Sequence, residues 1–166
     1  MAKRSLIKEL EKQESEELLR LLEEVSRRFP VAEMYLRMEF GFEAEPILEK
    51  YRKALTKEYF PSRGRGKARV SRADRILKEF ALVSAFPDDL MDMHWFQLHL
   101  AIRYHLVFGH DYEPFIKGIH RNWQKLLGMA SESGREEEFR EKAEQAFDGP
   151  YRRAGLISEM LAGKGA

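Results

Sequence analysis

Asp88–Gly109 reads DDLMDMHWFQLHLAIRYHLVFG, and its apolar side chains are spread around most of a helical circumference. That distribution is typical of a helix covered by neighbours on most sides, because a surface helix carries its apolar residues on one stripe. At ~1.5 Å per residue the helix would run roughly 33 Å, about the diameter of a small domain. The stretch therefore predicts a central buried helix over residues 88–109.

Polar side chains within this stretch argue against a membrane-spanning segment. Asp92, Gln97 and Arg103 interrupt it at every depth, and such groups are costly in lipid. The N-terminus, MAKRSLIKELEKQESEELL, is charged throughout and lacks the apolar run and the cleavage site of a signal peptide. We therefore expect a cytoplasmic protein without a membrane partner.

The six prolines mark the ends of successive helical patterns. Each proline falls where one apolar period fails and another begins, as expected of a residue tolerated only in a helix's first turn or outside it. No stretch alternates apolar and polar residues as a strand would. The sequence predicts an all-α fold, an irregular array or bundle of about seven helices around residues 88–109. Because Phe-Pro recurs at 29/30, 60/61 and 86/87, helix-hairpin repeats stay open as an alternative arrangement.

Length and composition indicate one domain. A chain of 166 residues with 43% hydrophobic content and a formal net charge of +1 is able to bury a core without disulfides or metal. The absence of cysteine excludes disulfide frameworks, Cys-ligated zinc, iron–sulfur clusters and thiol catalysis. We expect a single helical domain over residues 1–166, with a last helix at about 151–162 and a frayed tail at 163–166.

An early helix is predicted from Ser15 onward. Ser15 is a suitable N-cap, and the apolar residues that follow it recur at helical spacing while the rest of the segment is acidic. The pattern predicts an inward apolar stripe formed by Leu18, Leu22, Val25 and Phe29.

The strongest departure in composition is a basic, glycine-containing loop at residues 63–70. Residues 61–86 carry seven Lys or Arg against two acids, whereas residues 87–120 carry two against five. Several cations on a loop are able to converge on phosphate. The candidate anion- or nucleic-acid-binding residues are Arg63, Arg65, Lys67, Arg69, Arg72 and Arg75.

Local features of this loop leave two interpretations open. Gly64 and Gly66 predict flexible backbone, and Ser71 is expected to cap a helix whose N-terminus would attract anions. The loop is not a P-loop, since the GxxxxGK[ST] spacing is missing, and its only nearby aromatic residues, Tyr59 and Phe60, precede it. The alternative is a solvated loop that pairs with this protein's own acidic helices.

Five histidines fall in one region, but they lack the carboxylates that a metal site would need. His94 and His105 lie on nearly the same helical face, yet no acid stands between Asp92 and Asp111, and the Glu-x-x-His pairs of di-iron bundles are absent. We expect no metal and no cofactor. Local hydrogen bonding at the core edge or surface is the expected role of all five: His94, His99, His105, His110 and His120.

No residue set predicts catalysis. Asp88, Asp89 and Asp92 open the central helix, where the helix dipole favours acids without any chemistry being involved. Ser131 and Ser133 lie near a helix end and are typical turn residues. The sequence therefore predicts no catalytic residue, and we expect the protein not to be an enzyme.

The chain contains the segment KEYFPSRGRGKARVSRADRILKEF, which is preceded by ILEKYRKAL and by an N-terminal KRSLIKEL. In these segments the chain resembles a family of small bacterial all-helical proteins defined as a domain of unknown function. The later EPFIKGIHRNWQKLL and the acidic REEEFREKAEQAF fit the same pattern, so the likeness spans most of the chain. The resemblance implies a bacterial source and an all-α fold. It carries no catalytic residue over to this chain.

These observations favour a protein that works by binding. We expect a non-catalytic protein-interaction module with an unknown protein partner. The alternative is a nucleic-acid or phosphorylated-ligand binder that uses the basic residues between 63 and 75.

Overall fold

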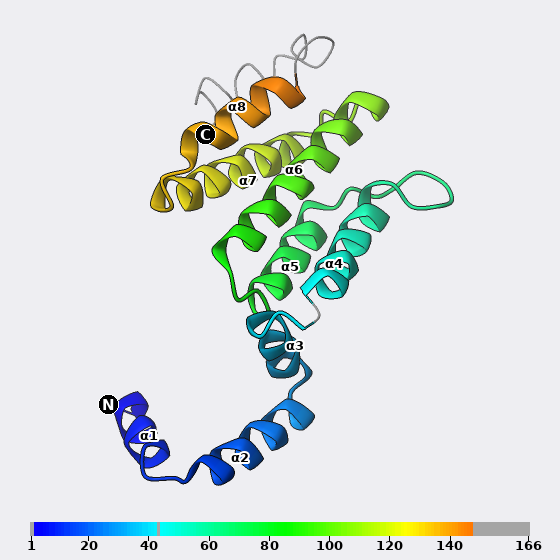
Figure 1. The fold of residues 1–166 in the computed structure, drawn as a ribbon. Coiled ribbons are helices and arrows are strands. Elements are labelled where there is room, and N and C mark those ends of the chain that lie inside the picture. The colour runs from blue at the N-terminus through cyan, green and yellow to red at the C-terminus, as the bar shows by residue number, and fades with distance from the viewer. Residues whose placement is uncertain (1, 43, 148–166) are drawn as a thin grey trace.

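The computed structural model describes residues 2–42 and 44–147, which form helices and, within those ranges, no strand (Figure 1). The predicted all-α array around a central helix is confirmed. The expected last helix at 151–162 and the tail at 163–166 lie outside the described residues. The described residues form eight helices: α1 (Ala2–Leu10), α2 (Ser15–Arg28), α3 (Pro30–Glu39), α4 (Ala44–Tyr59), α5 (Val70–Ala81), α6 (Pro87–Phe108), α7 (Glu113–Glu132) and α8 (Glu136–Ala146).

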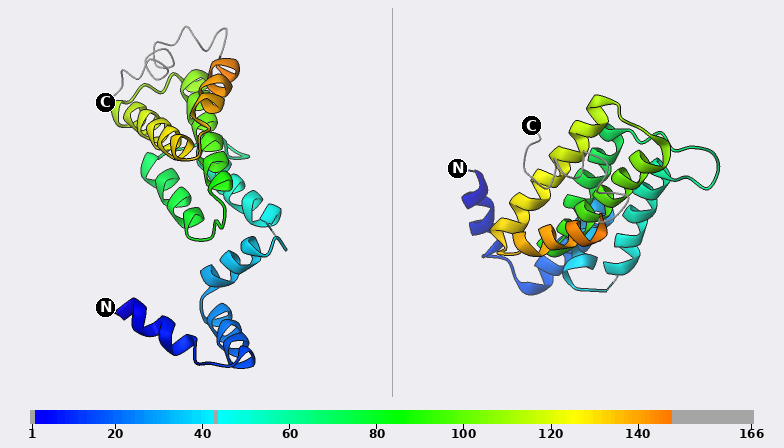
Figure 2. Two further views of the ribbon diagram at one scale, coloured as in Figure 1. Left: turned by 60° about the vertical axis from the view of Figure 1, so that its left-hand side comes forward. Right: turned by 90° about the horizontal axis from the view of Figure 1, so that it is seen from above.

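Helix α6 is the central element. Pro87, Asp88 and Asp89 form its first turn, where proline and acidic side chains are favoured, and Gly109 ends it in the left-handed conformation with φ 58°. The helix packs against α4, α5 and α7 (Figures 1 and 2). Its buried side chains point in several directions, as the sequence predicted: Met91, Met93, His94, Gln97, Leu98, Leu100, Ala101, Ile102 and Tyr104.

Helices α4 to α8 form one packed body. Each packs against the next in sequence, and α4 also contacts α6 while α5 contacts α7. Helices α5 and α7 lie close together at Gly118, where an added Cβ would lie 2.8 Å from both methyl groups of Val70. The largest enclosed side chains come from all five helices: Tyr59, Phe80, Tyr104, Phe115, Trp123 and Phe139.

Helices α1 to α3 extend away from this body, as Figures 1 and 2 show. We call residues 2–42 the N-terminal arm. Helix α2 packs on α3, and α3 packs on α4, so the arm joins the body at one end. Met38 of α3 is the one fully buried side chain among those described in the arm.

Within the described part of the chain, no helix is both long enough and apolar enough to cross a membrane. The cytoplasmic location and the bacterial source stay predictions, as does the assignment of residues 1–166 to a single domain.

Truncating the enclosed face of α6 tests its central position. Leu98 and Ile102 are both 0% exposed, so Leu98→Ala or Ile102→Ala should lower the free energy of unfolding by about 2–5 kcal/mol, because each leaves a cavity. Val107 on the same helix is 59% exposed and serves as the control, for which Val107→Ala should cost less than ~0.5 kcal/mol. Urea denaturation measures the three values. Equal losses at all three positions would contradict the central placement of α6.

Candidate functional site

The loop predicted at residues 63–70 belongs to the segment 60–69 between α4 and α5, since Val70 already starts α5. This segment, called the basic loop from here on, is fastened to the body. At Gly66 an added Cβ would lie 2.1 Å from the carbonyl oxygen of Tyr59, so this glycine permits a close approach to the end of α4. The Tyr104 hydroxyl donates a hydrogen bond to the Gly66 carbonyl oxygen at 2.7 Å. The prediction of flexible backbone at Gly66 is therefore wrong, because the residue is buried between α4 and α6.

The buried carboxylate of Glu58 holds the other end of the loop. It accepts hydrogen bonds at 2.9 Å from the backbone N–H, Nε and Nη2 of Arg69. These bonds, led by those from the Arg69 side chain, hold the pKa of Glu58 below its ordinary value. Ala68 adopts the left-handed conformation with φ 46°, and its N–H donates to the Glu58 carbonyl oxygen at 3.1 Å. One α4 residue thus binds two consecutive N–H groups of the loop.

This contact also sets the start of α5. The N-cap is Arg69 rather than the predicted Ser71, because Glu58 satisfies the Arg69 N–H from outside the helix. Ser71 lies inside the first turn and is exposed. The expected serine cap is therefore wrong by two residues, and the cause is a contact between residues eleven apart in sequence.

The structure separates the six predicted anion-binding residues into groups. Arg65 donates from Nε to the Tyr104 hydroxyl at 2.8 Å, and its guanidinium lies 4.8 Å from the centre of the Phe108 ring. Arg69 is paired with Glu58. Four of the six, with Lys57, line one hollow of about 520 Å³: Arg65, Lys67, Arg69 and Arg72. Anion binding by these four residues stays a prediction.

The remaining two candidates, Arg63 and Arg75, are exposed and lie outside the lining of that hollow. Arg63 is in the outer part of the loop next to Gly64, which has φ +72° and allows the chain to turn back. Neither residue has an ion-pair partner among residues 2–42 and 44–147. Their side chains are therefore free to meet solvent or an incoming anion, and their role also stays a prediction.

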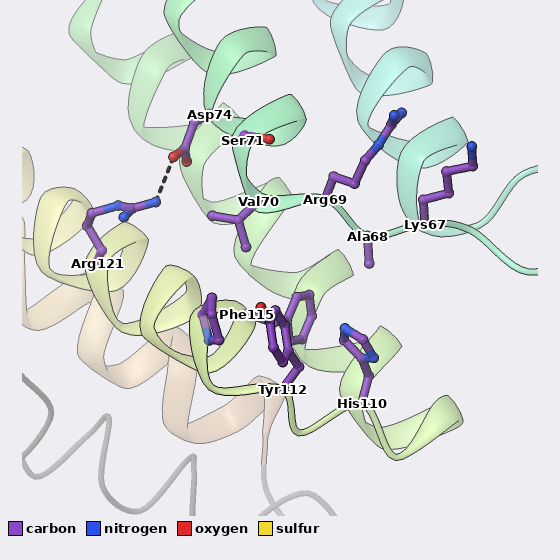
Figure 3. Close-up of a pocket in the computed structure, with 11 residues that line it drawn as sticks. Lys67, Ala68, Arg69, Val70, Ser71, Asp74, His110, Tyr112, Phe115 and Arg121 are labelled. Atoms are coloured by element: carbon purple, nitrogen blue, oxygen red, sulfur yellow. Dashed lines mark hydrogen bonds and ion pairs between the residues drawn. The ribbon is translucent and has the colours of Figure 1, made fainter.

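A second hollow, of about 620 Å³, lies between the start of α5 and the turn that joins α6 to α7 (Figure 3). Lys67, Arg69 and Arg121 contribute positive charge to its lining. Arg121 Nη2 donates to Asp74 at 2.6 Å, which joins α7 to α5 beside the hollow. Such a lining suits an anion.

This hollow does not hold an assembled catalytic triad. Ser71, His110 and Asp74 all line it, but within the described ranges no hydrogen bond connects His110 with either of the other two. His110 accepts a hydrogen bond only through its backbone, since its carbonyl oxygen binds His105 Nδ1 at 2.8 Å and, among the described residues, its ring makes no hydrogen bond. A serine nucleophile would need a hydrogen-bonded base, so the three residues provide no nucleophile for acyl transfer in this arrangement.

His94 belongs to a buried polar chain that links α4, α6 and α7. Asn122 donates from Nδ2 to the His94 carbonyl oxygen at 2.9 Å and also to Gln97 Oε1. Gln97 in turn donates to the Tyr59 hydroxyl at 2.5 Å. With its amide nitrogen used twice, Asn122 offers Oδ1 to the His94 ring, so Nδ1 of His94 carries the proton.

The other His94 ring nitrogen, Nε2, is buried without a hydrogen-bond partner within the described part of the chain. Burial is the main reason that the pKa of His94 falls to about 4, so the ring is neutral at pH 7.

The local hydrogen bonding expected of the histidines is confirmed for His94 and His105. The residue His99 is exposed on the whole. Its pKa is lowered mainly because part of the ring is buried, and to a smaller extent because of the positive charge of Arg103. His120 is buried.

Metal ligands are not gathered anywhere in the described residues, where no group of three or more His, Asp or Glu side chains could hold an ion. Of the acids that open α6, Asp88 has a structural partner. Asp88 accepts a hydrogen bond from Arg135 at 2.5 Å, which ties α6 to the turn before α8. Burial and then the neighbouring Asp92 and Asp88 raise the pKa of Asp89. The sequence does not predict the ion pair of Arg135, because its partner Asp88 lies 47 positions away.

The N-terminal arm exposes an apolar surface that the sequence analysis placed inside the core. Helix α2 has no fully buried residue. Leu18 and Val25 of the predicted inward stripe are half-buried, whereas Leu22 and Phe29 are exposed, so the prediction that the stripe lies inside the core is wrong. The periodicity was correct, but the packing of α3 on α2 does not enclose the stripe. Among the residues that the structure describes, fifteen large hydrophobic side chains are exposed, and ten of them belong to the arm: Leu6, Ile7, Leu19, Leu21, Leu22, Phe29, Val31, Tyr35, Phe40 and Phe42.

Comparison with known proteins gives one match. A family model described as "Family of unknown function (DUF6155)" matches residues 1–154, which include the arm and the body. No curated protein and no solved structure matches the chain. The resemblance to a domain of unknown function that the sequence suggested is confirmed.

Replacing Glu58, which anchors the basic loop, should lower the stability of the protein in a pH-dependent way. Glu58→Gln removes the negative charge that three Arg69 donors share, and should lower the free energy of unfolding by about 1–3 kcal/mol at pH 7. Because the folded pKa of Glu58 lies below its ordinary 4.5, the difference from wild type should persist above that pH and shrink as the pH falls below it. Arg63→Gln, which removes an exposed charge of the same loop away from Glu58, is the control and should leave the stability unchanged. A difference from wild type that stays constant down to pH 3 would contradict the ion pair.

The buried His94 predicts a second pH dependence in a different window. The unfolded state takes up a proton below pH 6.5, while folded His94 resists protonation until about pH 4. Stability should therefore be full above pH 6.5 and fall by about 3 kcal/mol from there to pH 4. His94→Gln should remove this dependence, because a glutamine amide has no proton to gain. Thermal unfolding at pH 7.5, 5.5 and 4.5 measures it, and parallel curves for the two proteins would show that His94 titrates normally.

Proposed function

This chain belongs to the family of unknown function DUF6155, and we propose that it is a non-catalytic protein-interaction module that associates with a second copy of itself through the N-terminal arm. The observation that carries this proposal is the concentration of exposed large hydrophobic side chains in the arm, which holds ten of the fifteen found in the described ranges. Monomeric soluble proteins rarely expose contiguous apolar surface beyond a few hundred Å², and larger patches mark interaction sites.

Helix α2 presents the most regular part of this surface. Leu18, Leu22, Val25 and Phe29 follow one another at intervals of four, three and four residues, which is the spacing of a helix-pairing seam. Leu22 is 47% exposed and Phe29 is 59% exposed. A helix with this seam and no buried residue of its own is suited to pair with another helix.

The pattern of α2 is complementary to itself when a second copy runs antiparallel. In that orientation Leu18 of one copy faces Phe29 of the other, and Leu22 faces Val25, so every layer of the seam is apolar. The acidic first turn, with Glu16 and Glu17, then lies beside the basic last turn of the second copy. Antiparallel pairing therefore places opposite charges together at both ends, whereas parallel pairing would align like charges.

The size of the interface requires more than α2. Stable dimers bury roughly 1,200–2,000 Å² in total, and a helix of this length, about 21 Å, supplies only part of that area. Leu6 and Ile7 of α1 and Val31 of α3 are exposed next to α2 in the chain and provide further apolar surface. The proposal therefore assigns the dimer contact to the whole arm, with α2 at its centre.

The non-catalytic part of the proposal is supported by the state of the polar residues in the body. Asp88 at the start of α6 is bonded to Arg135, and the buried His94 is bonded to Asn122. The proposed place of action is the cytoplasm.

The oligomeric state and its dependence on Leu22 test the proposal. We expect the purified full chain to show a concentration-dependent monomer–dimer equilibrium in analytical ultracentrifugation, at micromolar protein. Leu22→Glu places a charge in the centre of the seam and should shift the dissociation constant by at least about tenfold, since burying an unpaired charge costs more than ~1.4 kcal/mol. Because Leu22 is 47% exposed in the single chain, the thermal stability of the monomer should change little.

Gln13→Glu, which adds the same charge outside the seam, is the matched control and should leave the dimer intact. A wild-type chain that stays monomeric at roughly 100 μM would reject self-association. A dimer that Leu22→Glu leaves unchanged would reject the arm as the interface. Should a different purified protein bind the wild type and not Leu22→Glu while the chain alone is monomeric, the arm is an interaction surface but the second copy is the wrong partner.

A further inference from the structure

Three hollows on the surface of the body adjoin one another in a row. The first, of about 660 Å³, lies on α4 and α6 beside Phe60 and Phe96. It shares Lys57 and Pro61 with the hollow of about 520 Å³ under the basic loop. That second hollow shares Lys67 and Arg69 with the hollow shown in Figure 3. We call this row of hollows, from Phe96 through the loop to Tyr112, the basic band.

Positive charge dominates the basic band. Its lining contains eight Lys and Arg side chains and three carboxylates. Each carboxylate is already matched by one cation: Glu49 by Lys53, Glu58 by Arg69, and Asp74 by Arg121. Within the described ranges, four cations of the band have no acidic partner: Lys57, Arg65, Lys67 and Arg72. The unpaired charge is thus concentrated in the middle hollow.

Aromatic side chains stand at both ends of this charged middle. Phe96 is half-buried in the first hollow, and Tyr112 is 64% exposed at the far one. Phe60 also lines the first hollow, but its ring stacks on Phe108 and lies 5.1 Å from the Arg103 guanidinium, so Phe96 is the stacking candidate at that end. Aromatic rings that present a face to solvent stack on nucleobases, which bury their own apolar faces in return. The sequence showed aromatic residues only before the loop. The fold adds Phe96 from α6 and Tyr112 from the α6–α7 turn.

The middle of the band is held in place before any ligand arrives. Gly66, Ala68 and Arg69 are fastened to α4 and α6 by the contacts described above. Arg65 is set against the Tyr104 and Phe108 rings, with its guanidinium on the surface. A fixed cationic surface loses less conformational entropy on binding than a mobile loop.

We propose that the basic band binds single-stranded nucleic acid, with phosphates along Lys57, Lys67 and Arg72 and bases stacked on the aromatic side chains at its two ends. The chemistry favours a single strand because a duplex keeps its base faces stacked inside, out of reach of Phe96 and Tyr112. RNA and DNA share this chemistry, and the two are compared directly in the experiment. The proposal is independent of self-association through the arm.

Fluorescence anisotropy with the full chain tests the proposal. The probes are labelled 12-nucleotide RNA and DNA strands of mixed sequence, and the duplex formed from the same DNA. We expect binding to both single strands at 50 mM salt, with a slope of log K against log [salt] of about −2, as three phosphate contacts on a single strand require. RNA that binds more tightly than DNA identifies contacts to the 2′-hydroxyl.

Two variants separate the charges from the rings. The triple variant Lys57→Gln, Lys67→Gln, Arg72→Gln should weaken binding at least about tenfold and flatten the salt slope towards zero. Tyr112→Ala should weaken binding by about fivefold or more without changing the slope, because a lost stacking contact carries no counterions. The triple variant Lys8→Gln, Arg20→Gln, Arg27→Gln removes the same charge from the arm, and should bind as wild type does.

Three results would overturn the proposal. One is the absence of binding to either strand at 50 mM salt. Another is equal weakening by the arm triple variant and the band triple variant, which would mean that net charge alone attracts the strand. The third is duplex binding as tight as single-strand binding together with an unaffected Tyr112→Ala, which would remove the stacking role of the aromatic ends.

Discussion

Glu58 joins two helices and a loop by presenting both its backbone and its side chain to the same short segment. Its carbonyl oxygen accepts a hydrogen bond from the N–H of Ala68, and its carboxylate accepts hydrogen bonds from the N–H and the guanidinium of Arg69. A buried carboxylate that lost these donors would pay the cost of desolvation without compensation. The end of α4 and the start of α5 are therefore fixed relative to each other, and the loop between them has one available path.

That path brings the loop to α6 and makes it part of the body. Gly66 passes against the last turn of α4, where a side chain would collide with the Tyr59 carbonyl oxygen, and the Tyr104 hydroxyl binds its carbonyl oxygen. The body thus binds the polar groups of this loop internally, while the arm leaves much of its apolar surface to solvent. The two surfaces are chemically different, and the matched family model spans both.

The regularities that sequence reasoning captured are local ones. The central helix was predictable because apolar residues all round a segment require cover from several sides, and the ends of α6 followed from Pro87 and Gly109. The stripe on α2 was predictable as a stripe. Whether it faced the core depended on what packs there, and periodicity carries no information about that.

The candidate site was less predictable, because its contacts join residues far apart in sequence. Glu58 looks like one of many acids on an amphipathic helix, and only the fold shows that it is buried beneath Arg69. Gly66 was interpreted as a source of flexibility, although its role is close approach. The His94 ring is oriented by Asn122, which lies 28 residues away, so no spacing rule could have linked them.

Amide hydrogen exchange in the basic loop, followed residue by residue by NMR, tests most directly whether Glu58 fixes that loop. The structure predicts that the N–H groups of Ala68 and Arg69 exchange at least about a hundredfold more slowly than in an unfolded chain, because both are hydrogen-bonded to Glu58. The amide of Arg63, in the same loop without such a bond among the described residues, should exchange rapidly. Exchange of all three amides at the unfolded rate would show that the loop is free of α4 and would contradict the fixed basic surface.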